Sequence, residues 1–102
     1  MKNKSFKLLA RVSSSNPFAI KPVLEGLIKK GFVREEKDEF IVEATMEGTS
    51  AKELNRSLLS ELRSVEKKTR LRAEWTYNNT TEKYFDYVLK KTEKVADITS
   101  EK

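Results

Sequence analysis

The chain has 102 residues, of which 37% are hydrophobic and 36% are charged, and its 21 basic and 16 acidic residues give a net charge of +5. It contains no cysteine and no histidine, which excludes disulfides, thiol nucleophiles, Cys/His zinc sites and histidine-dependent acid–base catalysis. The length fits one α+β domain, predicted over residues 1–98, and the lack of thiols favours a reducing, cytoplasmic location.

Alternating apolar residues predict a strand over 5–13, and apolar residues at helical spacing predict a helix over 17–30. Asn16 precedes that helix as its expected N-cap. Pro22 fits poorly inside a helix, because it lacks a backbone donor and is compatible only with the first turn. The regular helix is therefore expected to begin near Ala19.

The next part of the chain predicts a hairpin and a second helix. Residues 32–36 and 39–46 have the composition of two strands joined at Lys37–Asp38. Ser50–Glu53 has the form of a capping box, in which a serine and a glutamate each satisfy a free backbone donor of the opening helical turn. An apolar stripe with helical period follows, so a helix is expected over 51–66.

The C-terminal part begins with the clearest strand of the sequence, Thr69–Tyr77, which alternates apolar and polar residues without interruption. The stretch Asn78–Thr81 is interpreted as a turn that also caps a helix. Residues 82–95 carry apolar side chains over a wide arc and are expected to form that third helix. Residues 99–102 have nothing to hold them and are expected to form a frayed tail.

This order, β-α-β-β-α-β followed by α, predicts an α+β fold. Right-handed crossovers place the first and third strands at the centre, which gives an antiparallel sheet of order 4-1-3-2 with two helices on one face. The arrangement is the ferredoxin-like split β-α-β, with an additional C-terminal helix, and the resemblance is to a fold and not to a family. The expected core residues are Phe6, Leu8, Ala10, Val12, Phe40, Val42, Ala44, Met46, Leu71, Ala73 and Trp75.

The opposite face of the predicted sheet is basic, and with the neighbouring helix end it can attract phosphates. The alternative is a solvated surface of cross-strand ion pairs, next to a helix end whose cations complement the helix dipole. The candidate nucleic-acid-binding residues are Lys7, Arg11, Arg34, Lys67, Lys68, Arg70 and Arg72.

Leu9 and Ile41 are expected side by side in the middle of that face. RNA-recognition motifs need outward aromatic residues on the central strands for base stacking, and the sequence lacks that signature. If exposed, Leu9 and Ile41 would form a partner-binding or homodimer surface. Burial by the protein itself, with the third helix folded across the sheet, is the expected arrangement.

The other clusters predict no chemistry. The acidic residues around the hairpin alternate in direction and are interpreted as a solvated turn rather than a metal site. Ser13–Ser15 has neither a glycine for a phosphate cradle nor a histidine to activate a nucleophile, so it is interpreted as a loop. The acidic residues around the hairpin are Glu35, Glu36, Asp38 and Glu39. No catalytic, cofactor or metal residue is predicted.

The sequence therefore predicts a non-enzymatic interaction module that binds a protein partner or itself through the open sheet face or the C-terminal helix. The alternative is an RNA- or DNA-binding protein that uses the basic sheet face. The N-terminal residues lack the apolar core of a signal peptide or a membrane span, so a soluble, unexported protein is expected. The absence of glutamine and the many charged residues point to a thermophilic archaeal or prokaryotic source.

Overall fold

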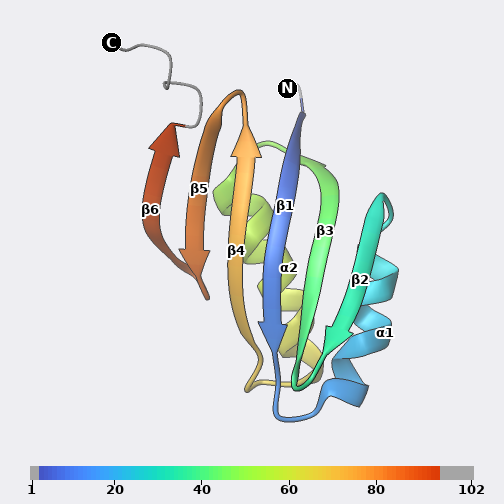
Figure 1. The fold of residues 1–102 in the computed structure, drawn as a ribbon. Helices are drawn as coiled ribbons and strands as arrows, with labels where there is room; N and C mark the ends of the chain where they lie inside the picture. Colours follow the sequence, from blue (N-terminus) through green and yellow to red (C-terminus); the bar gives the residue numbers. More distant parts are fainter. Residues whose placement is uncertain (1–2, 95–102) are drawn as a thin grey trace.

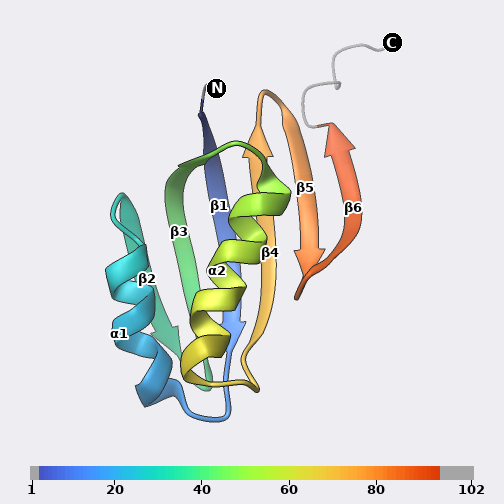
Figure 2. The same ribbon diagram turned by 180° about the vertical axis from the view of Figure 1, so that it is seen from behind.

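The protein is described from a computed structural model, which covers residues 3–94. Its secondary structure is one six-stranded sheet and two helices (Figure 1). Both helices lie on one face of the sheet (Figure 2). The other face, called the open face here, has no helix from the described residues over it. Along the chain the elements are β1 (Lys4–Ser13), α1 (Pro17–Leu27), β2 (Gly31–Glu36), β3 (Glu39–Gly48), α2 (Ala51–Val65), β4 (Arg70–Tyr77), β5 (Thr80–Phe85) and β6 (Val88–Lys94).

The predicted ferredoxin-like arrangement of order 4-1-3-2 with a C-terminal helix is wrong. The sheet contains six antiparallel strands in the order β2-β3-β1-β4-β5-β6. The third helix predicted over 82–95 is replaced by β5 and β6, which add a hairpin to the sheet beyond β4. In Figure 2, β6 lies beside the helical layer and not beneath it. The tail predicted at 99–102 lies outside the described residues.

The two asparagines after β4 explain this correction. Asn78 and Asn79 have φ angles of 54° and 65°, and Tyr77 pairs directly with Thr80 across them. Two central residues with positive φ define the type I′ hairpin turn, whose twist matches that of the flanking strands, and asparagine tolerates this conformation well. The chain therefore reverses into β5 at a point where a helix cap was predicted.

The first helix differs from its prediction in three details. It begins at Pro17 and contains Pro22, it ends at Leu27, and the Asn16 side chain makes no capping hydrogen bond. A proline at position 22 leaves the carbonyl of Phe18, four residues earlier, without its helical donor. Phe18 is 87% exposed, so water can satisfy that carbonyl in its place.

The second helix agrees with its predicted bounds and N-cap, but of the two hydrogen bonds of the predicted capping box only the one accepted by Ser50 occurs among the described residues. Its N-cap is Ser50, whose Oγ accepts a hydrogen bond of 3.1 Å from the backbone N–H of Glu53. The apolar stripe of this helix lies against the sheet, and every core residue predicted on β1, β3 and β4 belongs to the observed core, with Met46 at its margin.

Tyr84 of β5 joins the same core and is only 5% exposed. Its hydroxyl donates a hydrogen bond of 2.8 Å to Glu82 Oε1. Burial, and next this bond to the carboxylate, raise the pKa of Tyr84 well above its ordinary value. Tyr84 is therefore a neutral core residue that attaches β5 to the rest of the sheet.

A buried polar network attaches the β5–β6 turn to α2. Asn55, 1% exposed, accepts a hydrogen bond of 3.2 Å from Trp75 Nε1 and donates one of 2.7 Å to the backbone carbonyl of Asp86. The Asp86 carboxylate in turn accepts from the backbone N–H of Leu71 at 3.0 Å and lies 3.4 Å from Arg63 Nη2. The network satisfies the buried amide and indole and fixes the place where β5 ends.

Candidate functional site

The strand register arranges the open face in rows that run across the sheet. One row crosses all six strands and contains three arginines, two aliphatic residues and one phenylalanine, but no carboxylate. We call it the basic row. From β2 to β6 it consists of Arg34, Ile41, Arg11, Arg72, Phe85 and Val88.

Leu9 and Ile41 do not lie side by side as expected. Ile41 stands opposite Arg11 and Arg34, and Leu9 stands opposite Glu43 and Glu74. Leu9 is 46% exposed and Ile41 only 6%. Ile41 is not part of the core under the helices, so its burial comes from the open face, where the two flanking arginines stand. The expected cover by a third helix is wrong.

Two arginines of the basic row make exposed ion pairs. Arg11 Nη1 lies 3.0 Å from Glu39 Oε2, and Arg34 Nε lies 3.0 Å from Glu36 Oε2. Arg72 has no carboxylate within 4.0 Å among residues 3–94. The acidic partners belong to the β2–β3 hairpin, so the carboxylates predicted to form a solvated turn neutralise part of the basic row.

Phe85 lies on the open face beside two cationic side chains. The guanidinium carbons of Arg72 and Arg70 lie 5.3 and 5.4 Å from its ring centre, which is cation–π distance. Arg70 also lies 3.6 Å from Asp86, the residue held by the Asn55 network. The same network that fixes the end of β5 therefore holds one of the two cations beside the ring.

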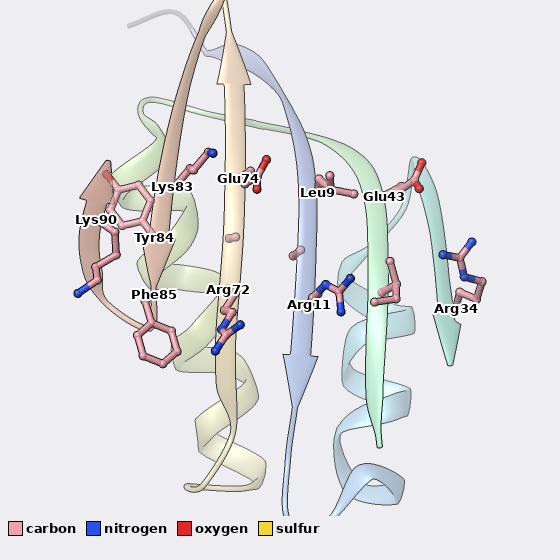
Figure 3. A pocket seen from close by; sticks show the side chains of 13 residues that line it. Leu9, Arg11, Arg34, Glu43, Arg72, Glu74, Lys83, Tyr84, Phe85 and Lys90 are labelled. Atoms are coloured by element: carbon pink, nitrogen blue, oxygen red, sulfur yellow. The ribbon is translucent and has the colours of Figure 1, made fainter. Parts of the chain in front are cut away.

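A depression of about 670 Å³ covers the middle of the open face. Figure 3 shows Arg11, Arg72 and Phe85 along its lower part and Leu9, Glu74 and Lys83 above them. Its walls combine cationic and apolar side chains with the carboxylates of Glu43 and Glu74. The cationic and apolar groups lie together along the basic row, and that combination suits an extended anion with flat apolar groups. The other side chains labelled in Figure 3 are Arg34, Glu43, Tyr84 and Lys90.

The structure brings together some of the predicted candidates and separates others. Arg11, Arg34 and Arg72 line the depression, and Arg70 lies beside it in a smaller hollow. Lys7 stands further along β1, opposite Thr45 and Thr76. Lys67 and Lys68 lie in the exposed turn between α2 and β4 and do not line the depression.

Sequence reasoning missed Lys83, Phe85 and Lys90, which the hairpin adds to the depression. All three fall within the segment that was predicted as a helix. The usable signal was the Asn78–Asn79 pair, because two asparagines after an alternating strand favour a hairpin. The alternation of Thr81, Lys83 and Phe85 then places these residues on one face of β5.

Lys83 takes part in a small ion-pair cluster at the edge of the open face. Its Nζ lies 3.1 Å from Glu93, which also lies 3.0 Å from Lys91 Nζ. The hydrogen bond to Glu93 raises the pKa of Lys83, and the hydrogen bonds from Lys91 and then Lys83 lower the pKa of Glu93. All of these groups are solvated, so the cluster contributes little to stability. The shifted pKa of Glu93 can nevertheless be used to test whether the ion pairs form.

Replacing Lys83 with methionine is expected to raise the pKa of Glu93 towards its ordinary value, because one of its two cationic donors is removed. The Lys91→Met variant removes the other donor and is expected to act in the same direction. The measurement is the pH dependence of the side-chain carboxyl carbon shift of Glu93 by NMR. A pKa of Glu93 that stays the same in both variants would contradict the cluster.

Three of the four acidic hairpin residues have cationic partners in the described part of the chain. Glu36 and Glu39 pair with the arginines described above, and Glu35 lies 3.6 Å from Lys21 Nζ. Within residues 3–94 no three acidic side chains are grouped so that they could hold a metal ion. Neither helix, and both lie inside the described range, is long and apolar enough to cross a membrane.

Comparison of the chain with protein family models, with curated proteins and with solved structures gave no match.

Proposed function

We propose that this protein is a cytoplasmic nucleic-acid-binding protein whose ligand, RNA in the first instance, lies across the open face. The observation that carries the proposal is the basic row, which combines three arginines with an aromatic ring and includes no carboxylate. Binding and not catalysis is proposed, because the basic row offers cations and apolar contacts, while the two carboxylates that line the depression, Glu43 and Glu74, stand in another row on either side of Leu9.

The shape of the basic row supports a polymeric anion over a small one. Neighbouring strands are about 4.8 Å apart, so the row spans roughly 24 Å from β2 to β6. Its three arginines lie on β2, β1 and β4, within three strand spacings or about 14 Å, and cations spread over such a length suit successive phosphates of one chain. Small anions are usually held by donors that converge on one point, and the arginines of the row project from separate strands.

The ion pairs of the basic row do not oppose this proposal. The side chains of Arg11 and Arg34 are 60% and 54% exposed. Exposed ion pairs contribute at most about 1 kcal/mol, so exchanging a carboxylate for a phosphate costs little. Arg72 needs no such exchange with the described residues, and we expect it to make the first phosphate contact.

The test is fluorescence anisotropy with a labelled single-stranded RNA of about twelve nucleotides at two or more salt concentrations. We expect micromolar affinity at low salt. Replacing Arg11, Arg34 and Arg72 together by glutamine should weaken binding at least about 30-fold and reduce the slope of log K against log salt by about 2. Glutamine keeps part of the stems that flank Ile41, so the fold should be retained.

The matched control replaces by glutamine three exposed cations that do not line the depression, Lys29 in the loop after α1 and Lys52 and Arg56 on α2. Both triple variants change the net charge from +5 to +2, but the control leaves the open face intact. Equal losses in the two variants would show attraction by net charge alone and would overturn the proposal. If polyglutamate, added at the same concentration of negative charges as the RNA, displaces the labelled RNA, the proposal is overturned in favour of an acidic protein partner.

Binding of a protein partner, or of a second copy, is the other candidate function. Leu9 and Phe32, 46% and 52% exposed, favour it, because they lie on the open face in the same row with only Glu43 between them. A second copy would bury these two side chains. Light scattering distinguishes a homodimer from a monomer that binds another protein. A mass of twice 11.8 kDa for the wild type, and of 11.8 kDa for Leu9→Ser, would establish self-association.

A further inference from the structure

Phe85 is an aromatic residue that the core does not use. It is only partly buried and lies on the open face, outside the apolar core beneath the helices. Its neighbours in the basic row are Arg72 on β4 and Val88 on β6, and Val88 is 58% exposed. An aromatic ring among cations, next to an exposed aliphatic side chain, is a surface on which a flat apolar group can lie.

The two cations beside the ring are held differently. Arg70 is anchored, because Asp86 lies 3.6 Å from its Nε and is itself fixed by the backbone N–H of Leu71. Arg72 approaches the same ring without a carboxylate partner among the described residues. One guanidinium therefore supports the ring, and the other is available to a ligand that reaches it.

Resting on the proposed function, we propose that Phe85 and Arg72 form a subsite for one unpaired base and its adjacent phosphate, so that the ligand is single-stranded. Every base has an apolar face that stacks on an aromatic ring or on a guanidinium plane. In a duplex these faces are covered by neighbouring bases, so they cannot stack on a ring that lies on the open face. Stacking on Phe85 therefore selects single strands without selecting a sequence.

The position of the subsite also sets the direction of the ligand. Phe85 stands near the β6 end of the basic row, while Arg11 and Arg34 stand towards β2. A single strand whose base stacks on Phe85 reaches these two arginines only by running across the strands of the sheet. The ligand chain thus follows the basic row, at right angles to β1.

The test compares a single-stranded oligonucleotide with an abasic one of the same length, which keeps the phosphates and lacks the bases. Wild-type protein is expected to prefer the oligonucleotide with bases by about tenfold. Phe85→Leu should abolish that preference and leave the salt slope unchanged, because no cation is lost. Phe85→Tyr keeps the ring and should keep the preference, and a 2-aminopurine probe should be quenched by Phe85→Tyr but not by Phe85→Leu.

The outcomes separate this inference from the function on which it rests. The subsite is refuted if wild-type protein binds the normal and the abasic oligonucleotide with equal affinity, or binds a duplex with the same affinity as a single strand. Neither result affects the prediction that binding depends on Arg11, Arg34 and Arg72. If the glutamine triple variant binds as wild type does, the proposed function itself fails. The abasic comparison needs no variant, so it remains decisive even where Phe85→Leu does not fold.

Discussion

Replacing Asn55 with leucine should lower the free energy of unfolding by about 3 kcal/mol, although it makes the interior more apolar. The side chain is 1% exposed, and it is the partner of both Trp75 Nε1 and the backbone carbonyl of Asp86. Leucine leaves the buried indole N–H and the part-buried carbonyl without this partner, at roughly 1–3 kcal/mol each. The midpoint of urea unfolding should fall by about 2 M.

The control for Asn55→Leu is Ser57→Leu, a polar-to-leucine change on the exposed side of the same helix. It should alter the stability by no more than about 0.5 kcal/mol. An unchanged midpoint in Asn55→Leu would mean that the network does not stabilise the fold. Because Asn55 also holds Asp86, the variant should loosen the turn that follows Phe85 and weaken any ligand contact made there.

Replacing Gly31 with alanine is expected to cost about 3 kcal/mol and to release β2 from the sheet edge. A Cβ at this position would lie 2.2 Å from the carbonyl oxygen of Glu43 and 2.5 Å from Ala44 Cα. Both are backbone atoms that cannot rotate away. The φ angle of 155° is also one that L side chains rarely adopt. Thermal unfolding followed by circular dichroism measures the effect.

Gly26 gives the matched control, because it is the same substitution at a site without neighbours. A Cβ on Gly26 meets nothing within 4 Å, and the residue lies inside α1. Alanine there should stabilise the protein by about 0.5–1 kcal/mol through its helix propensity. Opposite signs for the two Gly→Ala variants are therefore expected, and destabilisation of similar size in both would contradict the close approach of β2 to β3.

The fold could be predicted where one face of an element is buried and the other is wet. That condition holds for β1, β3, β4 and α2, whose apolar residues keep a period of two or of 3.6. It fails for 84–89, where Tyr84 is buried but Tyr87, Val88 and Leu89 are exposed at 43%, 58% and 48%. In a segment that is exposed on both faces, apolar residues do not recur with the period of a strand or of a helix. The run of apolar residues in this segment was therefore attributed to a helix.

The candidate site could be predicted to the same extent. Alternation alone placed Arg11, Arg34 and Arg72 on the face opposite the helices, and the register then set them in one row. Phe85 could not be found this way, because its place beside Arg72 depends on the pairing of β4 with β5. Cross-strand neighbours follow from a turn conformation, and that conformation rests on the two asparagines at positive φ.

The position of β6 beyond the helical layer gives the molecule two levels of local stability. Among the described residues β6 pairs only with β5, whereas β1 is paired on both sides and buries Leu8 and Val12 beneath the helices. Opening the hairpin breaks fewer buried contacts, so the amide protons of β6 should exchange with solvent sooner than those of β1. A ligand bound along the basic row would contact both β1 and the β5–β6 hairpin, and would therefore stabilise the hairpin against local opening. The amide protons of β6 should then exchange more slowly in the complex, even if the ligand does not touch the backbone of that strand.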